Sequence, residues 1–144
     1  MIALDSSVVV ACFGAWHENH SAALGVLKQD PRLPAYAALE AYSVLTRLPD
    51  PFRAAPATVA EFLRRTFPGP RLTLEPGEHD ALPTRLARLG VAGGAVYDAL
   101  IALTTQAAGA ELVTLDRRAL GIYERCGTST RLLMGDIPAA RKES

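Results

Sequence analysis

Three acidic residues, Asp5, Glu40 and Asp98, lie alone in stretches of the chain whose composition otherwise favours burial. The stretches in which each is the only Asp, Glu, Lys or Arg span residues 1–17, 33–46 and 89–110, respectively. A buried carboxylate is costly unless it has a partner or a cation, so three such cases in one small chain suggest a common reason. We therefore interpret these residues as candidate ligands of a metal ion.

A fourth acid, Asp116, directly follows an apolar segment at residues 111–115, as Asp5 follows the apolar segment at residues 2–4. Both segments are expected to be short buried strands, and sites in parallel sheets form outside the carboxyl ends of the strands. The other two isolated acids are expected near the starts of helices. We therefore expect all four carboxylates to converge at one end of the sheet.

Clustered carboxylates repel one another, which raises their pKa values unless a cation is present. Mg²⁺ and Mn²⁺ prefer oxygen ligands, and a bound ion of this kind activates water for the hydrolysis of a phosphodiester. Zinc is disfavoured because the His and Cys residues form neither an HExxH nor a CxxC arrangement. These residues are His17, His20, His79, Cys12 and Cys126.

Each acid also has a purely structural interpretation. The two acids that follow strands are in position to cap the next helices, and Asp98 is in position to stabilise a helix dipole. Glu40 precedes Ser43 and Arg47 by three and seven residues, the spacing of a solvent-facing helix stripe. None of these interpretations explains why isolated acids share one predicted edge.

The elements that must position these residues alternate between short apolar strands and helices. The expected strands are residues 2–4, 32–35, 71–74, 111–115 and 128–134. The expected helices are residues 7–13, 17–29, 36–48, 57–67, 76–89, 95–108 and 117–126. This alternation predicts parallel crossovers and a three-layer α/β/α sandwich around a parallel sheet of four to five short strands.

The overall composition predicts one globular domain. The chain has 144 residues, 49% of them hydrophobic, and its formal net charge is zero. No apolar run reaches the roughly 20 residues of a membrane span, so we expect no membrane association and a location in the cytoplasm. Zero net charge means that any nucleic-acid substrate has to be recognised by a local patch.

The sequence around the four acids resembles the PIN-domain ribonucleases, most closely the VapC-type toxins of toxin–antitoxin pairs. The resemblance is carried by IALDSSVVVA around Asp5, ALEAYSVLTRLP around Glu40, GGAVYDALIAL around Asp98 and LVTLDRRA around Asp116. It covers about residues 1–133 in the family's order. It predicts a PIN-like nuclease domain at residues 1–134, followed by a flexible tail at residues 135–144.

The resemblance implies a Mg²⁺-dependent endoribonuclease, with Mn²⁺ as a substitute, that cuts tRNA, rRNA or mRNA and inhibits translation. Such toxins form homodimers and are neutralised by a cognate VapB-type antitoxin. Asp5 and Asp98 correspond to the family's main metal-binding acids, and Glu40 and Asp116 correspond to the third acid and to a fourth, more variable one. The resemblance also implies that these four acids are the catalytic residues.

Further positions match the family or follow its motif. Ser7 and Thr114 are expected to orient neighbouring carboxylates. Arg117 and Arg118 are candidate RNA contacts, although antitoxin contacts and solvated helix residues remain alternatives. Other readings of the whole chain are a PIN-like nuclease of RNA processing or DNA repair without an antitoxin, and a non-catalytic PIN-like binding module. A degenerate module is expected to have lost some of the acids, and all four are present.

Overall fold

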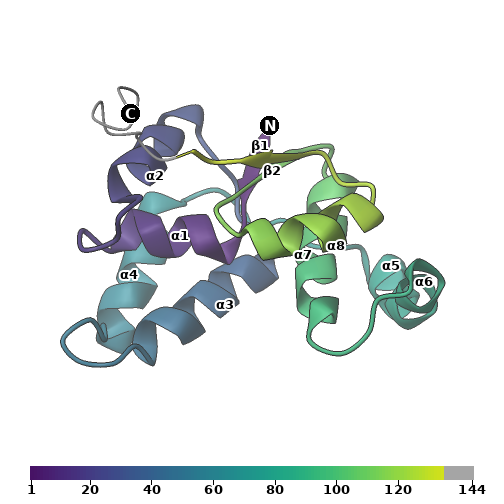
Figure 1. Ribbon diagram of the computed structural model, residues 1–144, viewed down its shortest axis with the longest axis horizontal. Coiled ribbons are helices and arrows are strands. Elements are labelled where there is room, and N and C mark those ends of the chain that lie inside the picture. The colour runs from purple at the N-terminus through teal and green to yellow at the C-terminus, as the bar shows by residue number, and fades with distance from the viewer. Residues whose placement is uncertain (135–144) are drawn as a thin grey trace, which may run out of the picture.

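The computed structural model describes residues 1–134 and contains a small parallel sheet (Figure 1). Strands β1 (Ile2–Leu4), β2 (Glu111–Thr114) and β3 (Thr130–Leu132) lie in the order β1-β2-β3. Both neighbouring pairs are parallel. The strands predicted at residues 2–4, 111–115 and 128–134 are therefore confirmed as β1, β2 and β3. The carboxyl ends of β1 and β2 lie side by side.

The prediction of four to five strands is wrong, because only three form in the described part of the chain. The other two predicted strands form only isolated parallel bridges, two from residues 32–35 and one from residues 71–74. Arg32 bridges to Ala3, and Pro34 bridges to Leu72. Proline has no N–H to donate to a ladder, so the segment that contains Pro34 cannot extend its pairing.

The helices separate the strands in the expected order. Their bounds are α1 (Ser6–Phe13), α2 (His20–Val26), α3 (Ala35–Thr46), α4 (Pro56–Thr66), α5 (Pro76–Asp80), α6 (Leu82–Leu89), α7 (Ala95–Ala107) and α8 (Leu120–Arg125). Single turns of 3₁₀ helix follow α2 and precede α8. The predicted helix at 76–89 is divided at Ala81, because Pro83 fits only the first turn of a new helix.

Helices cover both faces of the sheet, which confirms the α/β architecture with helical outer layers. Side chains alternate along a strand, so Ala3 and Leu112 pack with α7 and α8, whereas Leu4 and Val113 pack with α1, α3 and α4. Figure 1 shows α1 to α4 on the left and α5 to α8 on the right. No helix within residues 1–134 is both long and apolar enough to span a membrane. The tail predicted at 135–144 lies outside the described residues.

Candidate active site

Asp5 lies at the carboxyl end of β1 and caps α1. One carboxylate oxygen, Oδ1, accepts hydrogen bonds from the backbone N–H groups of Ser7 at 3.1 Å and Val8 at 3.4 Å. The residue is only 3% exposed. Asp5 therefore has the structural role of a helix cap, and its carboxylate is held at the end of the sheet by that role.

Three side-chain hydroxyls also donate hydrogen bonds to Asp5. The Ser7 hydroxyl contacts Oδ1, the Thr114 hydroxyl contacts Oδ2, and the Tyr123 hydroxyl donates to Oδ2 at 2.8 Å. Burial raises the pKa of Asp5, and these hydrogen bonds act in the opposite direction because they stabilise the ionised form. The carboxylate is thus buried, oriented from both sides and supplied with donors.

The hydroxyls of Ser7 and Thr114 connect this carboxylate to the end of β2. The Ser7 hydroxyl accepts a hydrogen bond from the Leu115 N–H at 2.9 Å, and the Thr114 hydroxyl accepts one from the Asp116 N–H at 2.9 Å. Each hydroxyl donates to Asp5 while it accepts from β2 or the residues just after it. The relative position of the two strand ends is therefore fixed by side chains as well as by the ladder.

Asp98 shows that the acids form one electrostatic cluster. It lies in the first turn of α7 and is half-buried. Burial raises its pKa to about 6, and the negative charges of Glu40, Asp116 and Asp5 add to the increase. A carboxyl group is affected in this way only by charges that are close to it, so residues far apart in sequence meet at one edge of the sheet.

The remaining two acids have different local partners. Glu40 on α3 accepts a hydrogen bond from the Ser6 hydroxyl. Asp116 caps the 3₁₀ turn after β2 by accepting from the Arg118 N–H at 3.0 Å, and the Arg118 Nε lies 3.8 Å from the same oxygen. Within residues 1–134, this exposed contact is the only ion pair made by any of the four acids. Most of the negative charge at the site is uncompensated.

The carboxylates do not close into a cage. No three His, Cys, Asp or Glu side chains in the described part of the chain lie close enough to hold one metal ion together. Two hollows border the acids instead. A polar hollow of about 390 Å³ is lined by residues that include Ser7, His17 and Asp116, and a second of about 330 Å³ is lined by residues that include Glu40 and Arg47. Such an open oxygen-rich edge fits Mg²⁺, which keeps several waters and takes one or two protein carboxylates.

Comparison with known proteins identifies the family. A family model for the PIN domain matches residues 2–124, a span that includes all four acids. The chain belongs to the PIN-domain family. Its relatives within that family confirm the expected resemblance to VapC ribonucleases.

Two of these relatives come from Mycobacterium tuberculosis (strain ATCC 25618 / H37Rv). The PIN domain is 47% identical over 133 residues to Ribonuclease VapC40, a match that covers 92% of this chain and 99% of the relative. It is 40% identical over 127 residues to Ribonuclease VapC27, which covers 88% of this chain and 92% of the relative. The similarity therefore extends over nearly the whole length of proteins named as ribonucleases.

The sequence does not indicate two of the contacts in this PIN domain. Tyr123 on α8 is 1% exposed and donates to Asp5, and Ser6 donates to Glu40. A buried tyrosine hydroxyl needs a hydrogen-bond partner, but nothing in the sequence around Tyr123 names an acid 118 residues away. Arg117 and Arg118 are exposed beside the site, and only Arg118 contacts one of the four acids, Asp116.

Proposed function

We propose that this PIN domain is a VapC-type endoribonuclease toxin that hydrolyses RNA phosphodiester bonds with the help of a divalent metal ion. The observation that carries the proposal is the position of Asp98. Its half-buried carboxyl group lies among three other acids, and no ion pair within residues 1–134 compensates it. The names of the relatives, both ribonucleases, support the same reaction.

One or two of the carboxylates of Asp98, Glu40, Asp116 and Asp5 would hold Mg²⁺ or Mn²⁺ directly, and the others would act through the waters that the ion keeps. A bound ion of this kind lowers the pKa of a water and neutralises negative charge that develops on the phosphate. Asp5 already accepts five hydrogen bonds, whereas a carboxylate has about four lone-pair sites. To act as a ligand through Oδ2, which accepts from Thr114 and Tyr123, Asp5 has to release one of these two donors. Rotation of the Thr114 hydroxyl achieves this without moving the backbone.

The residues of the chain have separate tasks in this reaction. Ser7, Thr114 and Tyr123 orient Asp5, and Ser6 orients Glu40. The four carboxylates repel an RNA phosphate, so the phosphate is excluded from the site until a cation is present.

We further propose that a cognate VapB-type antitoxin silences the site and that the toxin is a homodimer. The uncompensated acids support the first part, because a basic side chain of the antitoxin placed against Asp98 and Glu40 would neutralise them as a cation does. The second part rests on the resemblance to the family. Co-purification with the antitoxin and sedimentation of the free toxin test the two parts separately.

The test of the function is RNA cleavage by charge-removing variants. Asp98→Asn and Asp5→Asn are expected to lose more activity than the roughly 10–100-fold that follows loss of a residue that only orients a ligand. The matched control is Asp30→Asn, an exposed acid in the left-handed conformation that asparagine also tolerates. Cleavage of labelled RNA in Mg²⁺ is measured beside a circular-dichroism melt. Full activity in both folded variants contradicts the proposal.

A further inference from the structure

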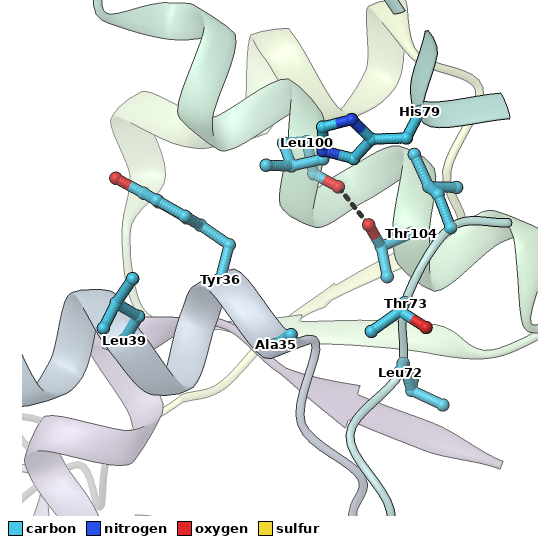
Figure 2. A pocket seen from close by; sticks show the side chains of 9 residues that line it. Ala35, Tyr36, Leu39, Leu72, Thr73, His79, Leu100 and Thr104 are labelled. Carbon is cyan, nitrogen blue, oxygen red and sulfur yellow. Dashed lines mark hydrogen bonds between the residues drawn. The ribbon is translucent and has the colours of Figure 1, made fainter. Parts of the chain in front are cut away.

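A pocket of about 300 Å³ opens beside α3 (Figure 2). It lies between α3, the segment at residues 72–74, α5 and α7. Tyr36, Leu39, Leu72 and Leu100 supply much of its apolar lining. Ligand pockets begin at about this size, so it admits one small planar group rather than a helix of another protein.

Tyr36 connects this pocket to the acids. It lies one helical turn before Glu40 on α3, and it also lines the hollow that Glu40 borders. Burial raises the pKa of Tyr36, and the nearby carboxylates of Glu40 and Asp98 add to the increase, as does the neighbouring phenol of Tyr97. The pocket and the acid cluster therefore share one wall.

The ring of Tyr36 is held by a second tyrosine. Tyr36 and Tyr97 are stacked, with ring centroids 5.2 Å apart and planes 15° from parallel. Tyr97 precedes Asp98 on α7 and is 51% exposed. The stacked pair thus bridges the two helices that carry Glu40 and Asp98, and it presents aromatic surface next to them.

Polar groups lie on the opposite side of the pocket. Figure 2 shows His79 and Thr73 across from Tyr36, both on exposed segments. Thr104 also reaches the pocket, but its hydroxyl already donates to the Leu100 carbonyl at 2.6 Å. His79 and Thr73 therefore supply hydrogen-bonding groups at the rim of a pocket that is otherwise apolar.

We propose that this pocket binds an unpaired nucleobase of the RNA substrate, next to the phosphodiester that the acids cut. The inference rests on the proposed ribonuclease function and names a subsite for its substrate. Proteins that read single-stranded RNA stack its bases on aromatic side chains and hydrogen-bond the base edges. Tyr36 is the stacking surface, and His79 and Thr73 are the groups at the edge.

The charge around the pocket selects a base over the other parts of RNA. A phosphate is repelled by the carboxylates of Glu40 and Asp98, whereas a nucleobase is neutral and has an apolar face. A base seated against Tyr36 places its own backbone toward the acid cluster, where a cation can receive the phosphate. The pocket thus sets which nucleotide of an unpaired strand lies at the cutting site.

The experiment measures the cleavage of each abasic RNA by each protein variant. Short unpaired RNAs lacking one base at successive positions are cleaved by the wild type, Tyr36→Leu and Tyr36→Phe. One abasic position is expected to lower kcat/KM of the wild type roughly tenfold. Tyr36→Leu is expected to show a similar loss on intact RNA and no further loss at that position, whereas Tyr36→Phe behaves as the wild type. Phe52→Leu, an exposed aromatic away from the pocket, is the control and keeps the wild-type profile.

If Tyr36→Leu loses cleavage at the same abasic positions and by the same factors as the wild type, the pocket does not bind a base. The proposed ribonuclease function is unaffected by that result. The same result with an altered sedimentation coefficient assigns the pocket to self-association instead, and also overturns the inference. A second measurement does not depend on cleavage. Nucleoside 5′-monophosphates are expected to shift the backbone amide resonances of Tyr36, Thr73 and His79, and ribose 5-phosphate is not. Equal shifts with the ribose control count against a base site, even if the chain cleaves RNA.

Discussion

At Asp98, burial and three neighbouring acids act in the same direction on one carboxyl group. The pKa of about 6 means that the group is largely ionised at neutral pH but at a cost to the fold. A folded protein tolerates such a cost where the same charge is needed for binding or catalysis. The isolation of Asp98 in an apolar stretch already predicts this conflict from the sequence.

Removing the charge at Asp98 is expected to stabilise the metal-free protein above pH 6. The folded-state pKa of about 6 lies above the ordinary aspartate pKa of 3.8, so between these values the folded protein binds more protons than the unfolded chain. The stabilisation that the protonated Asp98 contributes is therefore fully present below pH 3.8, and it is lost as the pH rises through the folded-state pKa of about 6. About 1 kcal/mol is expected, because half the group is exposed and solvent screens the full effect.

Urea unfolding from pH 4 to pH 8 in the presence of a chelator measures this effect as the difference between wild type and Asp98→Asn. The difference cancels the titration of groups that the two proteins share. A constant difference across the whole range would show that Asp98 has an ordinary pKa in the folded protein.

Among the elements, the ends of β1 and β2 depend on side chains to an unusual degree. The strands have only three and four residues, so their ladder contributes few hydrogen bonds. The Thr114 hydroxyl donates to Asp5 and accepts from Asp116, and thereby joins three parts of the site. Loss of this one hydroxyl removes one of the two donors to the buried Oδ2 of Asp5 and leaves the Asp116 N–H without its partner.

Thr114→Val is expected to lower the free energy of unfolding by about 1–3 kcal/mol, since valine keeps the shape and removes both hydrogen bonds. Thr105→Val is the matched control. Thr105 is equally buried, but its hydroxyl donates to the Ile101 carbonyl within its own helix, so a smaller loss is expected. Thermal and urea unfolding of the two variants provide the comparison. Equal losses would mean that the Thr114 hydroxyl contributes no more than any buried threonine.

The order of the helices and strands can be predicted from the sequence, but some of their boundaries cannot. Apolar periodicity predicts the strands at 2–4 and 111–115 and the helix at 95–108 to within one residue. It fails at 32–35 and 71–74, because whether a short apolar segment becomes a strand depends on how many partners the sheet offers it. It also fails within 76–89, where the turn at Ala81 allows Pro83 into a new helix.

For the whole molecule, the zero net charge conceals an uneven distribution. Within residues 1–134, some acids elsewhere are paired with arginine, namely Asp50, Glu61 and Glu111, whereas only Asp116 among the four acids at the sheet edge makes an ion pair. The sequence predicts that these acids meet, because each lies just after a strand or near a helix start. It cannot predict their distances, nor the approach of Tyr123 and the Tyr36–Tyr97 pair, since these arise from the packing of helices on both faces of the sheet.

Because the negative charge is concentrated in one place, a divalent cation is expected to stabilise the whole fold. An ion that binds only the folded state adds about 1.4 kcal/mol at ten times its Kd, which corresponds to a rise in Tm of roughly 3–5 °C for a domain of this size. Differential scanning fluorimetry of the wild type in chelator, in Mg²⁺ and in Mn²⁺ measures the shift. NaCl at matched ionic strength separates binding from screening, because screening affects exposed charges with either salt. Asp98→Asn is expected to lose most of the shift and Asp30→Asn to keep it. A wild-type protein that responds equally to NaCl and Mg²⁺ has no specific cation site at the acid cluster, and the metal-dependent mechanism then fails even if the chain cleaves RNA.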